Sequence, residues 1–151
     1  MTKKKNWIKL ISVCLFSILF SVFIFWKGII DVEKIALLGE DFQYNIITMS
    51  ATIGGFLFTG VGILISAIDK PHIRRLWDNY YLDNLYRAAF LGIISNIITI
   101  VSAFMFICGI VTKYRYLIYA EITSLIIGIV FFCWCIKKLL SIMKKMKNKT
   151  E

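Results

Sequence analysis

Apolar residues follow one another along this chain in four long runs, and polar residues gather in the stretches between them. The runs cover about residues 8–28, 46–68, 88–112 and 117–136. A helix crosses the hydrocarbon of a bilayer in about 20 mostly apolar residues, and an isolated segment in lipid must pair its backbone groups internally. The pattern therefore predicts an all-α integral membrane protein, an antiparallel four-helix transmembrane bundle that forms a single domain over residues 1–151.

The polar connection between the second and third runs has a helical pattern of its own. Asp69 fits an N-cap and Pro71 fits the first turn, as at many helix starts. Apolar residues then recur at helical spacing, which predicts a short amphipathic helix over about 70–86 in the membrane interface. The segment is either a plain elbow between two spans or a contact surface for lipid or a cytosolic protein. The residues expected to make such contacts are Arg74, Arg75 and Trp77.

Composition supports the membrane interpretation. Apolar residues make up 59% of the chain and charged residues only 18%, whereas soluble domains average about 45–50% and 25%. Trp and Tyr fall at the predicted span boundaries, where their amphipathic rings favour the headgroup region. No small-residue cleavage site follows Trp26, so we expect the first span to be retained and not removed as a signal peptide.

The net charge of +9 would suggest a nucleic-acid partner in a soluble protein. Here the predicted spans explain how the basic residues are distributed. A topology with the N-terminus inside places 14 of the 18 Lys and Arg residues on one side of the membrane. By the positive-inside rule we expect both termini, including the basic tail 137–151, to lie on the cytoplasmic side of the cell membrane. The expected partner of these charges is the lipid bilayer, and no nucleic-acid partner is predicted.

Small residues form a stripe along one face of the second span. The stripe consists of Ala51, Gly55, Thr59, Gly62 and Ser66, at helical spacings of three and four. Such a stripe allows another helix to approach closely in lipid. It is either a packing surface within one chain, or an interface between copies of the chain or the lining of a pathway.

Polar residues line one face of the third span, centred on Ser95, Asn96 and Thr99. An amide near the middle of a span requires a partner, and a hydrogen bond to a neighbouring helix is the simpler expectation for Asn96. The alternative is contact with a ligand or ion. Together with the stripe of the second span, this face would line a narrow polar pathway in an oligomer.

Glu121 is the only ionisable residue inside a predicted span. An ionisable residue at membrane depth is rare and usually has a functional role. However, Glu121 lies only one turn past Leu117, so we expect its carboxylate to reach the outer headgroups or to pair with a nearby base. The nearby bases are Lys34, Lys113 and Arg115.

Groups for catalysis or metal binding do not gather anywhere in the sequence. His72 stands alone, and the four Cys residues lie in or beside apolar runs without metal-ligand spacing. We therefore expect no catalytic residues, no metal, no cofactor and no enzymatic activity. The expected function is an oligomeric pore-forming or membrane-perturbing effector, such as a toxin-like or phage-defence component. The alternative is a membrane-anchored interaction or immunity protein that binds a partner through residues 69–87.

Overall fold

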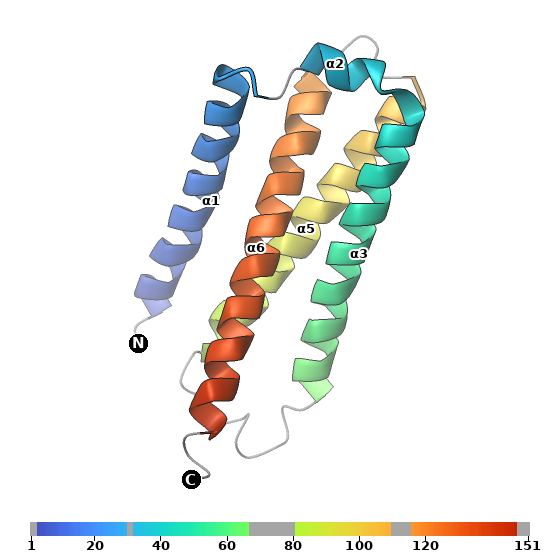
Figure 1. The fold of residues 1–151 in the computed structure, drawn as a ribbon. Coiled ribbons are helices and arrows are strands. Elements are labelled where there is room, and N and C mark those ends of the chain that lie inside the picture. Colours follow the sequence, from blue (N-terminus) through green and yellow to red (C-terminus); the bar gives the residue numbers. More distant parts are fainter. Residues whose placement is uncertain (1–2, 30–31, 67–80, 110–115, 148–151) are drawn as a thin grey trace.

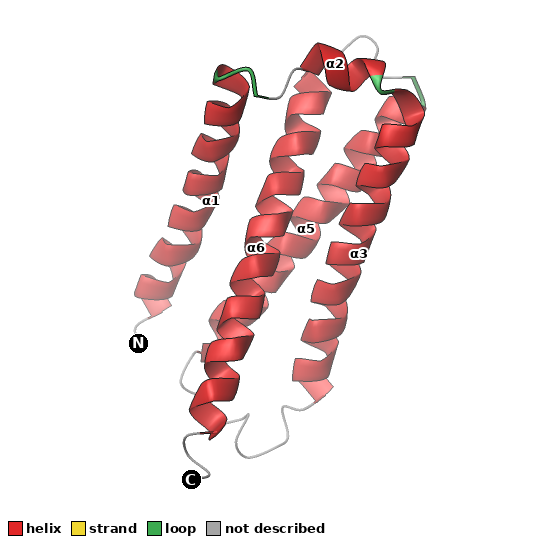
Figure 2. Cartoon of the chain, in the orientation of Figure 1, coloured by secondary structure: helices red, strands yellow, loops and turns green. Residues whose placement is uncertain are grey.

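The computed structural model describes residues 3–29, 32–66, 81–109 and 116–147. All regular structure in these ranges is helical (Figure 2). The helices are α1 (Lys3–Trp26), α2 (Val32–Leu37), α3 (Gly39–Ser66), α5 (Tyr81–Ile107) and α6 (Tyr116–Lys147). The all-α prediction is therefore confirmed.

Four of these helices are long and apolar enough to cross a membrane. The segments that meet this criterion are Ile8–Trp26, Gly39–Ser66, Leu82–Ile107 and Tyr116–Ser141. Their number agrees with the prediction, but all four long helices extend beyond the apolar runs at one end or both. The chain stays helical there because each residue added to an existing helix contributes another backbone hydrogen bond, whether its side chain is apolar or polar.

The early start of α3 has an identifiable cause. Gly39, the first residue of α3, has a φ of 70°, a value that side chains disfavour, and it sets the direction in which the chain enters the helix. Glu40 and Asp41 follow in the first turn, where their negative charges interact favourably with the N-terminal end of the helix dipole. Helix α3 therefore begins seven residues before the predicted apolar run at 46.

Helix α5 begins with residues that the sequence assigned to the interfacial helix. Tyr81–Tyr86 form its first turns, and Asp83 in this stretch pairs with Arg87 one turn later at 3.1 Å. Such a pair supports the helix at this spacing. The remainder of the predicted interfacial helix, residues 70–80, lies outside the described residues.

Helix α5 packs along both α3 and α6, whereas α1 lies to one side and contacts α6 (Figure 1). The short helix α2 lies at one end of the bundle, which we call the α2 end. Both chain termini lie at the opposite end, which we call the terminal end (Figure 1). At the α2 end, α1 meets α6 through an edge contact between Phe25 and Tyr119, with ring centroids 4.6 Å apart.

The outer faces of the long helices are strongly apolar. Phe58, for example, is 71% exposed, and Phe16 and Leu19 are each 67% exposed. Exposed apolar surface of this extent is typical of helices that contact lipid rather than water.

Candidate functional site

The interior of the bundle contains an unusual number of buried polar side chains, concentrated toward the α2 end. We call this set the polar section. It comprises Gln43 and Ser50 on α3, Ser95, Asn96, Thr99 and Ser102 on α5, and Glu121 and Ser124 on α6. Buried polar groups normally have hydrogen-bond partners, so the partners of each residue indicate what the section can do.

Hydroxyl groups connect α5 to α6. Ser95 Oγ donates to the backbone oxygen of Ser124 at 2.6 Å, and the hydroxyls of Thr99 and Ser124 share a bond of 2.8 Å. Ser124 also donates to the backbone oxygen of Glu121. Interhelical bonds of this kind hold helices together where no hydrophobic effect acts between them.

Asn96 lies in a cradle of glycines. Its Nδ2 donates to the backbone oxygen of Gly92 on its own helix at 2.7 Å, so the predicted bond to a neighbouring helix is wrong. The neighbouring helices instead leave room for the amide, because they carry glycines there. A Cβ at Gly128 would lie 2.7 Å from Asn96 Nδ2, and a Cβ at Gly54 would lie 3.6 Å from Asn96 Cβ. The Oδ1 atom of Asn96 is buried and has no hydrogen-bond partner.

Glu121 faces the interior of the bundle. Its side chain is 1% exposed and lies beside the Gln43 amide of α3. The expectation that Glu121 reaches the headgroups is therefore wrong, because the inner face of α6 directs it toward α3. Among the described residues it pairs with no base, and Lys113 and Arg115 lie outside them.

Several polar atoms of this section are buried without a hydrogen-bond partner among the described residues. They are Gln43 Oε1 and Nε2, Ser50 Oγ, Asn96 Oδ1 and Glu121 Oε1. An unpaired buried group of this kind costs about 1–3 kcal/mol, so water or a bound ion would stabilise the section. The polar section thus offers hydrogen-bond donors and acceptors that a small polar ligand such as water would satisfy.

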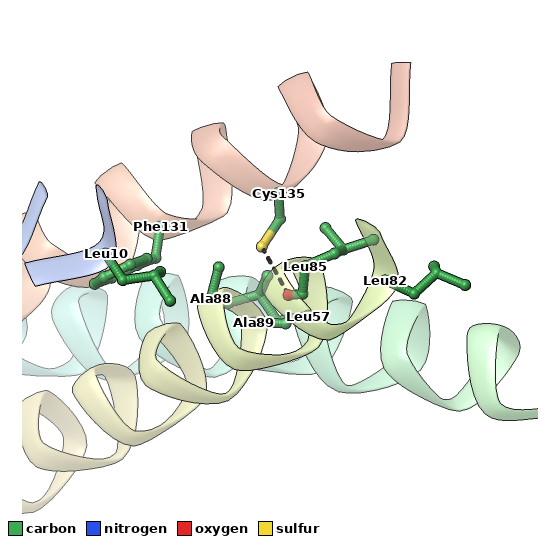
Figure 3. Close-up of a cluster of buried hydrophobic side chains, with 8 residues drawn as sticks. All are labelled: Leu10, Leu57, Leu82, Leu85, Ala88, Ala89, Phe131 and Cys135. Carbon is green, nitrogen blue, oxygen red and sulfur yellow. Dashed lines mark hydrogen bonds between the residues drawn. The ribbon is translucent and has the colours of Figure 1, made fainter. Parts of the chain in front are cut away.

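Toward the terminal end the core becomes apolar. We call this set the apolar section (Figure 3). It comprises Leu10, Leu57, Leu82, Leu85, Ala88, Ala89, Phe131 and Cys135. The Cys135 thiol makes only a long contact of 4.0 Å with the backbone oxygen of Leu85. Asn84 is a buried polar residue at this end, so this part of the core is mostly but not entirely apolar.

The two sections meet at Gly92. A Cβ on this glycine would lie 2.7 Å from Leu57 Cδ1 and 3.2 Å from Phe131 Cβ. The side chains from α3 and α6 therefore press directly on the α5 backbone, and Phe131 is 0% exposed. This contact separates the polar section from the terminal end of the bundle.

The small-residue stripe of the second span lies elsewhere. All five residues, Ala51, Gly55, Thr59, Gly62 and Ser66, are exposed on α3, and no atom lies within 4 Å of a Cβ built at Gly55 or Gly62. Among the described helices, none packs against these five residues. Within one chain the stripe and the polar face of Ser95, Asn96 and Thr99 thus point to different surroundings, and a pathway that both would line in an oligomer stays a prediction.

Other predicted contact residues, Arg74, Arg75 and Trp77, lie outside the described residues. Within the described ranges, no three His, Cys, Asp or Glu side chains gather as metal ligands would. Sequence analysis missed Gln43, Ser124 and Gly128. The helical spacing of Glu121, Ser124 and Gly128 places all three on one face of α6, and this was the signal for Ser124 and Gly128.

These features define an all-helical chain with four helices able to cross a membrane and a core divided into polar and apolar sections. The chain matches no known protein family, no curated protein and no solved structure.

Proposed function

We propose that this chain is a membrane-permeabilising protein whose ion path passes through the polar section and is closed by the apolar section. The observation that carries the proposal is the set of buried, unpartnered polar atoms between α3, α5 and α6. Polar groups at membrane depth are expensive unless they contact water, ions or each other, and they commonly mark pathways.

The proposal places the four long helices across the membrane as an antiparallel bundle, with both termini on the cytoplasmic side. The side-chain contacts between α5 and α6 support opposite directions, because Ser95 meets Ser124 whereas Leu85 meets Cys135. Lower residue numbers on α5 thus pair with higher numbers on α6. The excess of basic residues on the terminal side supports the orientation.

Phe131 acts as the closure in this proposal. It lies ten residues beyond Glu121 on α6, or roughly 15 Å along the helix axis. Removing its ring would leave a space beside Gly92 that joins the polar section to the terminal end. The described arrangement is then the closed form, and movement of α6 relative to α5 would open it.

Ion flux from potassium-loaded liposomes tests the function. We expect Phe131→Ala to leak potassium and Phe104→Ala, whose ring is 60% exposed on the outer face of α5, to remain tight at equal amounts of folded protein. Adding Thr99→Val to Phe131→Ala should suppress the leak, because it removes a hydroxyl from the path. Adding Thr123→Val, at a partly exposed hydroxyl outside the path, should not.

Equal leaks from the two Phe variants would refute the proposed path. So would a leak from Phe131→Ala that Thr99→Val and Thr123→Val affect alike, because loose packing alone would then explain it.

The proposal also includes association of identical chains through the exposed stripe on α3. Small residues allow close helix approach in lipid, and Gly55 and Gly62 have open space around them. The molecular mass in detergent should fall from that of an oligomer to that of a monomer in Gly55→Leu/Gly62→Leu. Ala120→Leu, at an exposed small residue on α6, is the control and should leave the mass unchanged. A wild-type monomer would contradict this part of the proposal.

A further inference from the structure

A groove of about 580 Å³ lies between α1 and α6 near the terminal end. It is lined by Ile8, Lys9, Ser12 and Val13 from α1 and by Trp134, Lys137, Lys138 and Ser141 from α6. None of these residues belongs to the polar section. The groove therefore requires its own explanation.

The groove exists because α1 touches α6 only locally. Leu10 inserts into the apolar section, and the neighbouring Val13 and Cys14 pack against it. On the other side of this contact, Ser12 and Lys9 face α6 across open space. The volume lies within the range of sites that hold small molecules, about 300–1,000 Å³.

Positive charge dominates the lining. Lys9, Lys137 and Lys138 contribute three ammonium groups, and the described lining residues include no acidic side chain. The described residues contain no ion pair to any of these lysines. Like charges gathered without a counter-ion favour an anionic occupant.

Trp134 holds one of these charges in place. Lys138 Nζ lies 5.8 Å from the centre of the Trp134 ring, a cation–π distance that keeps the ammonium group at the groove.

The remaining lining identifies the kind of anion. Ile8 and Val13 provide apolar surface beside the lysines, and Ser12 and Ser141 provide hydroxyl groups. The groove therefore combines a charged and hydrogen-bonding region with an apolar wall. An anionic phospholipid has the same combination in its phosphate group and acyl chain, and basic pockets between membrane helices recognise such headgroups.

We propose that the groove between α1 and α6 binds an anionic phospholipid, with its phosphate held by Lys9, Lys137 and Lys138. The acyl chains lie along the apolar wall formed by Ile8 and Val13. The bound lipid joins α1 to the rest of the bundle at the end where the protein contacts between them are few. This inference concerns lipid binding and does not depend on ion conduction.

Native mass spectrometry of the protein with phosphatidylglycerol or phosphatidylcholine tests the proposal. We expect wild-type protein to retain one phosphatidylglycerol at concentrations at which it retains no phosphatidylcholine. Lys137→Gln/Lys138→Gln should weaken retention by about tenfold or more, because two charge-assisted contacts to phosphate are lost. Lys27→Gln/Lys34→Gln removes the same charge from two exposed lysines outside the groove. This control should change the retention of phosphatidylglycerol by less than about twofold.

A second variant separates the site from general electrostatic attraction. Trp134→Leu removes the ring that keeps Lys138 at the groove but leaves all three lysines, and we expect it to weaken retention several-fold while helicity and monodispersity stay normal. Trp26→Leu, at a residue 81% exposed, should have no effect. The comparison between the two Trp variants stays valid if the lysine substitutions lower the stability of the protein.

Three results would overturn the proposal. The first is equal retention of the two lipids, and the second is equal loss in the two lysine double variants, which would indicate diffuse attraction. The third is complete displacement of the lipid by equimolar glycerol 3-phosphate, because the groove would then be a site for free phosphate compounds.

Discussion

The two sections of the core share helices α3, α5 and α6, to which the apolar section adds Leu10 of α1, and yet they stabilise the bundle in different ways. In the polar section, Ser95, Thr99 and Ser124 connect α5 to α6 by hydrogen bonds, and several neighbouring atoms have no partner. In the apolar section, Leu57 and Phe131 contact the backbone at Gly92 directly. The difference indicates that close packing determines the position of the helices at one end, whereas hydrogen bonds connect them at the other end, where several polar atoms have no partner among the described residues.

The largest effect is expected from Phe131→Ala. Removing a fully buried aromatic ring from the apolar section should lower the free energy of unfolding by about 3–5 kcal/mol, because a cavity remains. Unfolding in mixed micelles with increasing dodecyl sulfate measures this loss. Phe104→Ala, on the exposed face of the same bundle, should cost less than half as much, and equal losses would show that the apolar section is not the better packed part.

An intermediate effect is expected where Asn96 meets Gly128. Gly128→Ala should destabilise the protein by about 1–3 kcal/mol, because the new methyl group would overlap the Asn96 amide. In a protein that already carries Asn96→Ala, Gly128→Ala should lower the stability only slightly, since the amide that the new methyl group would overlap is absent. A double-mutant cycle measures this coupling, and additive effects would mean that the cradle does not hold the amide.

The smallest effect is expected from Thr99→Val. The bond between Thr99 and Ser124 should contribute only about 0.6–2 kcal/mol, as for other hydrogen bonds between membrane helices. Thr123→Val is the control at a partly exposed hydroxyl. A loss for Thr99→Val as large as that for Phe131→Ala would reverse the comparison between the two sections.

Much of this fold could be predicted because hydrophobic runs of membrane length leave the backbone few alternatives. The helix ends were less predictable. The start of α5 at Tyr81 depends on local groups such as Asp83 and Arg87, which support a helix without extending its apolar run.

The site was only partly predictable, because periodicity identifies a face of a helix but not what lies opposite. Asn96 and Thr99 were correctly grouped on one face, and the structure adds that Ser124 and Gly128 lie against it. The exposed stripe on α3 has the same spacing as a packed one. Glu121 was placed by its depth alone, whereas its direction depends on the rotation of α6.

The central claim is that water reaches the polar section and not the apolar section. Reaction with a small, water-soluble methanethiosulfonate tests it, because a thiol reacts as the thiolate and that form requires hydration. Two proteins are compared, both without Cys14, Cys108 and Cys133: one retains Cys135, and the other carries Cys135→Ala and Ser124→Cys. We predict that the thiol at position 124 reacts at least about tenfold faster than Cys135. Equal rates, or faster reaction of Cys135, would contradict the account.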